Sequence, residues 1–321
     1  MPTFRYSNPP VIHWGAGSVQ QLPTELERLG ATRVALISTN SLRGVKLPVE
    51  PVVTATIGQH APIAQVDEAA GKAREAGADG VVSFGGGSPI DAAKVVAMRL
   101  DVLHVAVPTT LSVAELASGA GYTDAAGNKA GLRDPKLLPD VVIYDAELTL
   151  DTPMELWLST GIRALDHAVE GILADGDHPF NDVMALESIH RLFESLPRAK
   201  ANPNDLSVRS ENQLAAWFSF TLPGASASGL SHTMGKQIGA RHGIPHGVTS
   251  CLLLPNVMRY LGRKQALPVG ADDVEKLIGD LGLPQHIAAY GIGEPELRKA
   301  ASELAGKYPE EDLLAIYLAA L

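Results

Sequence analysis

The chain has a single cysteine, few aromatic residues and no long apolar run. Cys251 is the only cysteine among 321 residues, so an internal disulfide is excluded and a reducing compartment is expected. No apolar stretch approaches the roughly 20 residues that a membrane-spanning helix requires. The N-terminus lacks a basic segment followed by an apolar core, and we therefore expect no secretory leader and a cytoplasmic protein.

Positive charge is also scarce. The sequence contains 26 lysines and arginines against 36 aspartates and glutamates, which gives a net charge of -10 and a pI near 5.5. This balance disfavours nucleic acid and anionic membrane surfaces, so we expect neither as a partner. A local basic pocket in an acidic protein can still bind an anion, and a small acidic substrate is not excluded.

Hydrophobic residues make up 45% of the chain, and their pattern changes once along it. The first half alternates short β-branched runs with helical patterns, which predicts a parallel sheet covered by helices. Strands are predicted at 34–38, 52–57, 81–84, 102–107 and 141–144, and a helix at 64–76. No convincing strand follows Thr152-Pro153. We therefore predict an α/β dinucleotide-binding domain at 1–152 and an all-helical catalytic and substrate domain at 153–321.

Three consecutive glycines, Gly85, Gly86 and Gly87, follow the third predicted strand. Ser88 is the expected N-cap of the next helix, with Asp91 three residues after it. Glycines let the backbone approach a ligand closely, and a helix N-terminus offers N–H groups to a phosphate. The turn matches neither common phosphate-binding fingerprint, so a merely tight turn is the alternative. Hydroxyl groups at the carboxyl edge of the same sheet, where ligands of such sheets bind, come from Thr109 and Thr110.

Histidines gather in two places in the second half of the chain. His232, His242 and His246 lie in one short stretch that glycines and a proline bend, and an apolar run follows. His167 shares a helical stripe with Arg163, four residues before it. Three imidazoles, from His167, His232 and His246, are a common donor set for a transition metal. The alternative is that these histidines cap helices or hydrogen-bond to the backbone, and the spacing fits both.

These motifs together resemble the iron-containing (group III) alcohol dehydrogenase family. The matching segments, in the order of the family, are G-G-G-S-x-x-D-x-A-K at 85–94, P-T-T at 108–110, D-H-A-V-E at 166–170, S-H-x-M-G at 231–235, I-P-H-G at 244–247 and L-L-L-P at 252–255. The resemblance implies a dehydroquinate synthase-like fold with an α/β cofactor domain and an all-α domain. It also implies hydride transfer between NADH or NADPH and a small substrate in the interdomain cleft, and a homodimer.

Two positions depart from the family's metal site, which resembles one aspartate and three histidines. Arg163 stands where the aspartate would be, and Asp166 is about 100° round the helix from His167. Lys236 replaces a further histidine. The remaining ligand positions match His167, His232 and His246. A guanidinium beside a divalent ion in a partly buried site would cost several kcal/mol, so we expect Fe or Zn to be absent or weakly bound.

One branch of the family, the maleylacetate reductases, is similar in departing from the aspartate ligand. The opening F-R-Y-S-N-P-P-V-I-H-W-G-A-G-S and the run at 137–150 also resemble that branch. We therefore predict metal-independent reduction of a small, carboxylated substrate. Arg163, Lys236 and His232 would bind the anion, and His242 or His246 would donate the proton. The alternatives are a metal-dependent alcohol or aldehyde dehydrogenase using the three histidines, and a nucleotide-binding relative without catalysis.

Two further residues carry expectations about the cofactor. Asn40 ends the first predicted strand, where an aspartate of the family would hold the adenosine ribose and exclude a 2′-phosphate. An uncharged asparagine leaves NADPH open, and Arg43 could meet that phosphate. Lys129 resembles a family lysine near the cofactor, and a solvated loop lysine is the alternative.

Overall fold

The computed structural model describes residues 8–176, 178–220, 229–262 and 267–321. These residues divide into two compact units. The sheet unit comprises residues 8–152 together with Asn204–Leu214, and the helical unit comprises Pro153–Pro203 and Ala215–Leu321. The chain passes from the sheet unit to the helical unit at Thr152–Pro153. The later return of Asn204–Leu214 to the sheet unit has no counterpart in the predicted division.

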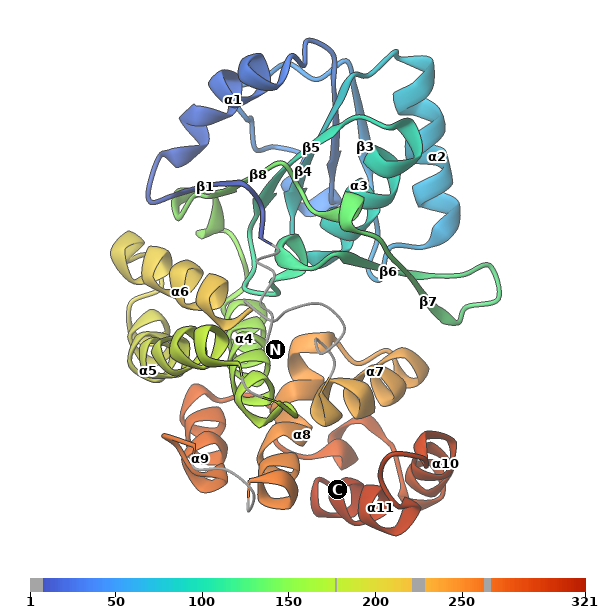
Figure 1. Ribbon diagram of the computed structural model, residues 1–321, viewed down its shortest axis with the longest axis vertical. Helices are drawn as coiled ribbons and strands as arrows, with labels where there is room; N and C mark the ends of the chain where they lie inside the picture. Colours follow the sequence, from blue (N-terminus) through green and yellow to red (C-terminus); the bar gives the residue numbers. More distant parts are fainter. Residues whose placement is uncertain (1–7, 177, 221–228, 263–266) are drawn as a thin grey trace. The chain divides into compact units, whose positions relative to one another are not determined.

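Within the described residues, six parallel strands form one sheet in the order β1-β8-β5-β4-β2-β3. Figure 1 shows this sheet with the helices around it. Their bounds are β1 (Val11–Trp14), β2 (Val34–Ser38), β3 (Val53–Thr56), β4 (Gly80–Gly85), β5 (Leu103–Pro108) and β8 (Val141–Tyr144). Each of the five predicted strands is present. The sequence did not predict β1, which pairs with β8 in the register Val11 to Val141.

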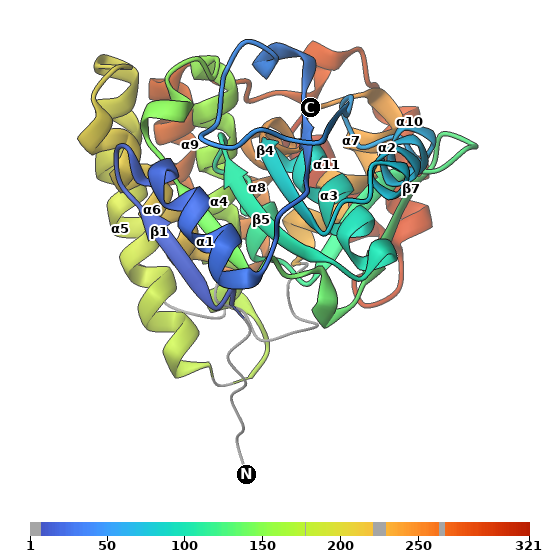
Figure 2. The same ribbon diagram turned by 90° about the horizontal axis from the view of Figure 1, so that it is seen from above.

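Helices cover both faces of this sheet. Val81 belongs to the core under α2 (Ile63–Glu75) and α3 (Gly87–Leu100). Its neighbour Val82 belongs to the core under α1 (Leu22–Leu29). Successive strand residues point to opposite faces, so a sheet buried on both sides needs apolar residues at consecutive positions. Figure 2 shows α1 on one face and α2 and α3 on the other.

A hairpin that the sequence did not predict lies between β5 and β8. Its strands β6 (Gly119–Thr123) and β7 (Lys129–Arg133) pair antiparallel and project from the sheet unit in Figure 1. Lys94 on α3 is fully buried and holds the segment that leads into the hairpin. Its ammonium group donates to the carbonyl oxygens of Ala114, Ala117 (2.7 Å) and Gly119 (2.9 Å).

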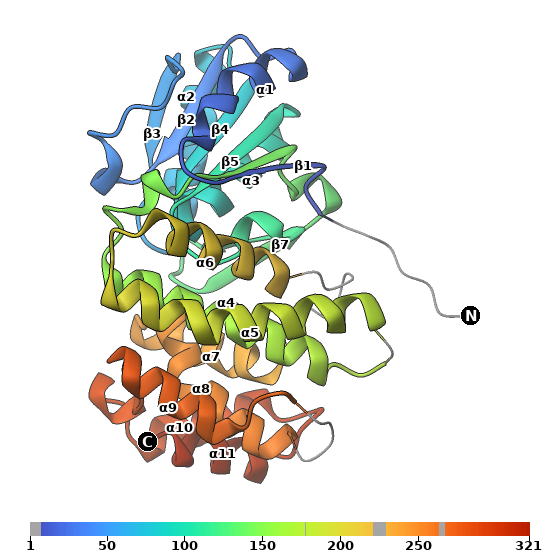
Figure 3. The ribbon, with the colours of Figure 1, turned by 90° about the vertical axis from the view of Figure 1, so that its left-hand side faces the viewer.

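The second half of the chain is helical, and its described part contains no strand. The helices are α4 (Met154–Leu173), α5 (Pro179–Ala201), α6 (Leu206–Ser219), α7 (Leu230–His242), α8 (His246–Leu261), α9 (Ala271–Leu281), α10 (Glu294–Leu304) and α11 (Glu310–Ala319). Figure 3 shows α4 and α5 running alongside each other. One core cluster joins Met234 of α7, Leu253 of α8 and Tyr317 of α11.

The predicted fold class is therefore confirmed: a parallel α/β sheet is followed by an all-helical region. Across the part of the chain that the structure describes, no helix is both long enough and apolar enough to cross a membrane. The homodimer, the cytoplasmic location and the exclusion of nucleic acid stay predictions.

Candidate functional site

The strand order creates a change of winding direction between β2 and β4. The chain runs from β2 outward to β3, and then returns to the other side of β2 to form β4 and β5. Ligands of open α/β sheets bind outside the carboxyl ends of the strands at such a point. Ser38 ends β2 and donates its hydroxyl to the carbonyl oxygen of Phe84 in β4, at 2.8 Å. The predicted cofactor residues therefore have a common location at this edge.

The glycine turn requires glycine for geometric reasons. Gly85 has φ +141°, and a Cβ there would lie 2.8 Å from Cγ of Pro89. Only glycine adopts such a conformation at little cost. The helix α3 begins at Gly87 with Gly86 as its N-cap, and no side chain among the described residues caps it. The N–H groups of its first turn are thus available at the carboxyl edge of β4, where they suit a phosphate.

The prediction that Ser88 caps α3 was wrong. The backbone at Gly86 is extended and the helix begins at Gly87, so the N-cap lies two residues before Ser88, which is already inside the helix. The Ser88 hydroxyl oxygen instead accepts the N–H of His60, at 2.9 Å. Asp91 accepts the N–H of Gly121 at 3.0 Å, and so connects α3 to the β6–β7 hairpin.

Thr109, Thr110 and Asn40 follow strands at the same edge, whereas Lys129 begins β7 of the hairpin. Thr109 donates its N–H to the Gly85 carbonyl at 2.9 Å, and the Thr110 methyl lies 3.1 Å from where a Gly86 Cβ would be. Asn40 is exposed at the start of a short 3-10 helix directly after β2. Nζ of Lys129 lies 3.7 Å from where a Cβ of Gly121 would be. Burial lowers the pKa of Lys129, and the charge of Asp91 opposes that shift.

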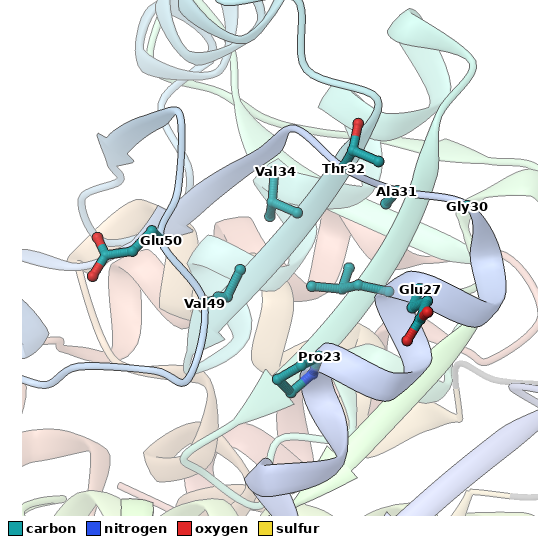
Figure 4. Close-up of a pocket in the computed structure, with 9 residues that line it drawn as sticks. Pro23, Glu27, Gly30, Ala31, Thr32, Val34, Val49 and Glu50 are labelled. Carbon is teal, nitrogen blue, oxygen red and sulfur yellow. The ribbon is translucent and has the colours of Figure 1, made fainter.

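A cavity of about 290 Å³ opens at the other end of the sheet. It lies at the amino end of β2, between α1 and the segment before β3 (Figure 4). Its lining residues are Pro23, Leu26, Glu27, Gly30, Ala31, Thr32, Val34, Val49 and Glu50. None of the predicted site residues is among them, so we assign this cavity no role in cofactor binding.

The centre of the helical site is Arg163, in the middle of α4 and 5% exposed. Its NH1 donates to Oδ2 of Asp166 at 3.3 Å and to the Ser250 hydroxyl oxygen at 3.0 Å. Its NH2 lies 3.1 Å from Nε2 of His232. A guanidinium has no acceptor, so Arg163 must be the donor in this contact and Nε2 of His232 the acceptor.

Two buried carboxyl groups support this arrangement. Oδ2 of Asp166 also accepts the hydroxyls of Ser231 at 2.9 Å and Ser250 at 2.6 Å. Burial raises the pKa of Asp166, and Arg163 and the serine hydroxyls oppose that shift. Oε1 of Glu170 accepts the N–H groups of Ser231 at 2.5 Å and His232 at 3.4 Å at the start of α7. Burial, and then the charge of Asp166, raises the pKa of Glu170 well above its usual value.

Three of the predicted histidines form a row. The ring centroids of His167 and His232 are 5.5 Å apart, and those of His232 and His246 are 6.5 Å apart with nearly parallel planes. Burial, and then the positive charges of Arg163 and Lys236, lowers the pKa of His167 well below its usual value. His167 is therefore neutral at physiological pH. The exposed Lys236 lies one helical turn after His232 on α7.

His242 does not join this group. It is the last residue of α7 and follows His232 by ten residues, which corresponds to about 15 Å along the helix axis. The sequence predicted a turn at His242, because glycines and a proline separate the histidines of this stretch. The helix nevertheless continues to His242 and ends at Gly243, whose φ of +67° terminates it.

The residues present do not fit a metal ion among the three imidazoles. The Nε2 lone pair of His232 is occupied by the N–H of Arg163, and a cation stands where the family's aspartate would. Over the ranges that the structure describes, no three His, Cys, Asp or Glu side chains are arranged to hold an ion. The metal content of the protein stays a prediction.

The sequence did not predict the two serines that donate hydrogen bonds to Asp166. The pairing of Arg163 with Asp166 had a signal, because residues three apart share a helix face. No local sequence pattern indicated the contacts of Ser231 and Ser250, since these residues belong to α7 and α8 and follow Asp166 by 65 and 84 residues.

Comparison with known proteins identifies the family. Residues 9–146 match the family description "Iron-containing alcohol dehydrogenase", and residues 157–267 match "Fe-containing alcohol dehydrogenase family, C-terminal". The chain is 34% identical to maleylacetate reductase of Rhizobium sp. (strain MTP-10005), over 96% of this chain and 93% of that protein. It is also 34% identical to maleylacetate reductase of Sphingobium indicum, over 93% and 90% of the two chains.

Solved structures agree with these matches. The crystal structure of maleylacetate reductase from Agrobacterium tumefaciens superposes with a TM-score of 0.91 at 29% identity, covering 100% of this chain and 99% of that one. The enzyme from Rhizobium sp. strain MTP-10005 superposes with a TM-score of 0.90 at 30% identity, with 100% and 99% coverage. The sequence motifs, the fold and these similarities lead to one conclusion: the chain belongs to the iron-containing alcohol dehydrogenase family.

Proposed function

We propose that this protein is an NAD(P)H-dependent reductase of a small, carboxylated substrate, similar to maleylacetate reductase, and that it needs no metal ion. Arg163 is the observation that carries the proposal. A buried guanidinium occupies the position of the family's aspartate ligand and donates to the histidine nitrogen that would otherwise face the ion. The similarity to maleylacetate reductases over nearly the full chain supports the same substrate class.

The sheet unit would bind the dinucleotide. The uncapped first turn of α3 and the Thr109–Thr110 hydroxyls suit its phosphates. No acidic residue occurs between positions 39 and 49, whereas Arg43 and Lys46 are basic, so nothing there repels a 2′-phosphate. We therefore expect both NADH and NADPH to bind. The bound cofactor would supply the hydride.

The helical unit would supply positive charge and a proton. Arg163 and Lys236 would bind a carboxylate or polarise the oxygen of the carbon that accepts the hydride. His167 is neutral because its pKa is lowered, so it is a poor proton donor. Nε2 of His232 accepts a hydrogen bond from Arg163, so it carries no proton to donate. This leaves His246, next to His232, as the proposed proton donor.

The test combines an assay with metal analysis. NADH and NADPH oxidation would be followed with maleylacetate and with simple aldehydes, before and after chelation, on protein of measured metal content. We expect turnover of the dicarboxylate, substoichiometric metal and no effect of chelation. Arg163→Lys keeps the charge but loses the planar fork, and should lower kcat/KM by about 100-fold. Arg298→Lys, at an exposed surface position, is the matched control.

Two outcomes would contradict the proposal. One Fe or Zn per chain together with loss of turnover on chelation would identify a metal-dependent alcohol or aldehyde dehydrogenase. Cofactor binding without turnover on any substrate of the panel would identify a non-catalytic relative.

A further inference from the structure

We propose that Asp166 is a positioning residue that directs the Arg163 guanidinium onto Nε2 of His232, and so keeps His232 in the tautomer with its proton on Nδ1. The three side chains come from two helices, α4 and α7, and are linked without a gap. Asp166 accepts from NH1 of Arg163 at 3.3 Å, and NH2 of Arg163 donates to His232 at 3.1 Å.

The guanidinium is held at one end by two acceptors. Both hydrogens of NH1 are used, one by Oδ2 of Asp166 and one by the Ser250 hydroxyl oxygen. Ser250 has one hydroxyl proton and gives it to Asp166 at 2.6 Å, so its oxygen is left to accept from Arg163. Because the guanidinium is planar, fixing NH1 also fixes the direction of NH2.

Asp166 is itself held by three helices. Its Oδ2 accepts from Arg163 on α4, Ser231 on α7 and Ser250 on α8. The residue is completely buried, and an arginine buried beside it needs a neighbouring negative charge. Removing the charge of Asp166 would therefore leave the buried positive charge of Arg163 uncompensated and would weaken the hydrogen bond that orients its guanidinium.

The consequence for His232 follows from hydrogen counting. A neutral imidazole carries one N–H, and Nε2 cannot carry it while it accepts from Arg163. The proton must then lie on Nδ1, which is buried and has no hydrogen-bond partner among the residues that the structure describes. A free histidine side chain prefers the proton on Nε2, and a buried unpartnered N–H is costly. His232 therefore holds this tautomer only while Arg163 is in place.

Because this arrangement engages Nε2, His232 neither ligates a metal nor protonates a substrate from that atom. Its part would be to help orient Arg163 from the side opposite to Asp166. This catalytic consequence rests on the proposed function, whereas the tautomer itself does not.

Nitrogen NMR of the full-length protein tests the tautomer directly. With ¹⁵N-labelled histidine, two-bond proton–nitrogen correlations distinguish a protonated Nδ1 from a protonated Nε2, and the loss of one set of signals in His232→Gln assigns the residue. We expect the Nδ1–H form in the wild type and conversion to Nε2–H in Asp166→Asn. Asp272→Asn, 91% exposed on the same unit, should leave the signals unchanged.

The result that would overturn the proposal is Nε2–H at His232 in the wild type, or Nδ1–H retained in a folded Asp166→Asn. If Asp166→Asn does not fold, Ser250→Ala removes one acceptor of NH1 and keeps the charge, and it should populate both tautomers. If His232 keeps the Nδ1–H tautomer alone in Ser250→Ala, that result would count against the proposal.

Activity gives a separate readout. If the reductase proposal holds, Asp166→Asn should lower kcat by up to about 100-fold and leave the KM for the cofactor unchanged. An unchanged kcat would mean that Arg163 needs no positioning. A wild-type protein with the expected tautomer but no turnover would contradict the reductase and not the Asp166–Arg163–His232 arrangement.

Discussion

His104, at the start of β5, is a buried histidine outside the candidate site. Its Nε2 lies 2.8 Å from the Ser83 hydroxyl, and Nδ1 has no partner in the described part of the chain. Burial, and secondarily the charge of Lys94, lowers the pKa of His104 to about 3. The side chain is therefore neutral in the folded protein at any pH where the fold is expected to persist.

This shift predicts acid sensitivity of the fold. An unfolded histidine has a pKa near 6.5, so as the pH falls the unfolded chain takes up this proton first. The contribution of His104 is complete above pH 6.5 and is lost progressively down to about pH 3. The loss amounts to about 2 kcal/mol between pH 7 and pH 5.

Urea unfolding at several pH values measures this loss. As the pH decreases below 6, the free energy of unfolding of His104→Gln should fall less steeply than that of the wild type, by about 1.4 kcal/mol per pH unit. His190→Gln, whose side chain is 65% exposed, should keep the wild-type slope. Equal slopes in wild type and His104→Gln would contradict the buried neutral state.

At the scale of elements, the start of α7 depends on a carboxyl group from α4. Glu170 accepts the N–H groups of Ser231 and His232 in the first turn of α7, and Gly229 is the residue immediately before that helix. A Cβ on Gly229 would lie 2.2 Å from Cδ of Glu170. Glycine is therefore needed there for space rather than for backbone freedom.

Gly229→Ala should destabilise the protein, because either the carboxyl group or the helix start must move. We expect a loss of about 1–3 kcal/mol in the free energy of unfolding, as for other overpacked sites. Gly71→Ala is the matched control: it lies inside α2 with nothing within 4 Å, and should stabilise by about 0.5–1 kcal/mol. A neutral Gly229→Ala would mean that Glu170 does not hold α7 in this way.

At the scale of the whole molecule, the one cysteine reports on the integrity of the helical unit. Cys251 lies on α8, is 1% exposed and donates its thiol to the Gly247 carbonyl at 3.3 Å. Burial raises the pKa of Cys251 well above its usual range. The reactive thiolate is thus scarce and out of reach in the native protein.

Thiol titration should therefore find no reactive group in the folded protein and one per chain in denaturant. The reaction rate at intermediate denaturant should follow the opening of the helical unit. Ser302→Cys places a second thiol at an exposed position of α10 and should react at once. Rapid labelling of the wild type under native conditions would contradict the burial of α8.

Local patterns were sufficient for most elements. The strands β2, β4, β5 and β8 are short apolar runs buried on both faces, and their composition identifies them. The strand β1 was missed because its four residues pair with β8, 130 positions later. The β6–β7 hairpin was missed because its glycine-rich strands have low β-propensity.

The sequence by itself determined the alternation of strands and helices and the glycine turn, because periodicity and motif spacing involve residues close together in the chain. Its resemblance to the family indicated that Arg163 stands at the position of the aspartate ligand. Only the tertiary structure decided which polar groups meet. Arg163 donates a hydrogen bond to His232, 69 residues later, and Asp166 accepts hydrogen bonds from serines of α7 and α8. Such contacts depend on how three helices pack, and no local pattern encodes that packing.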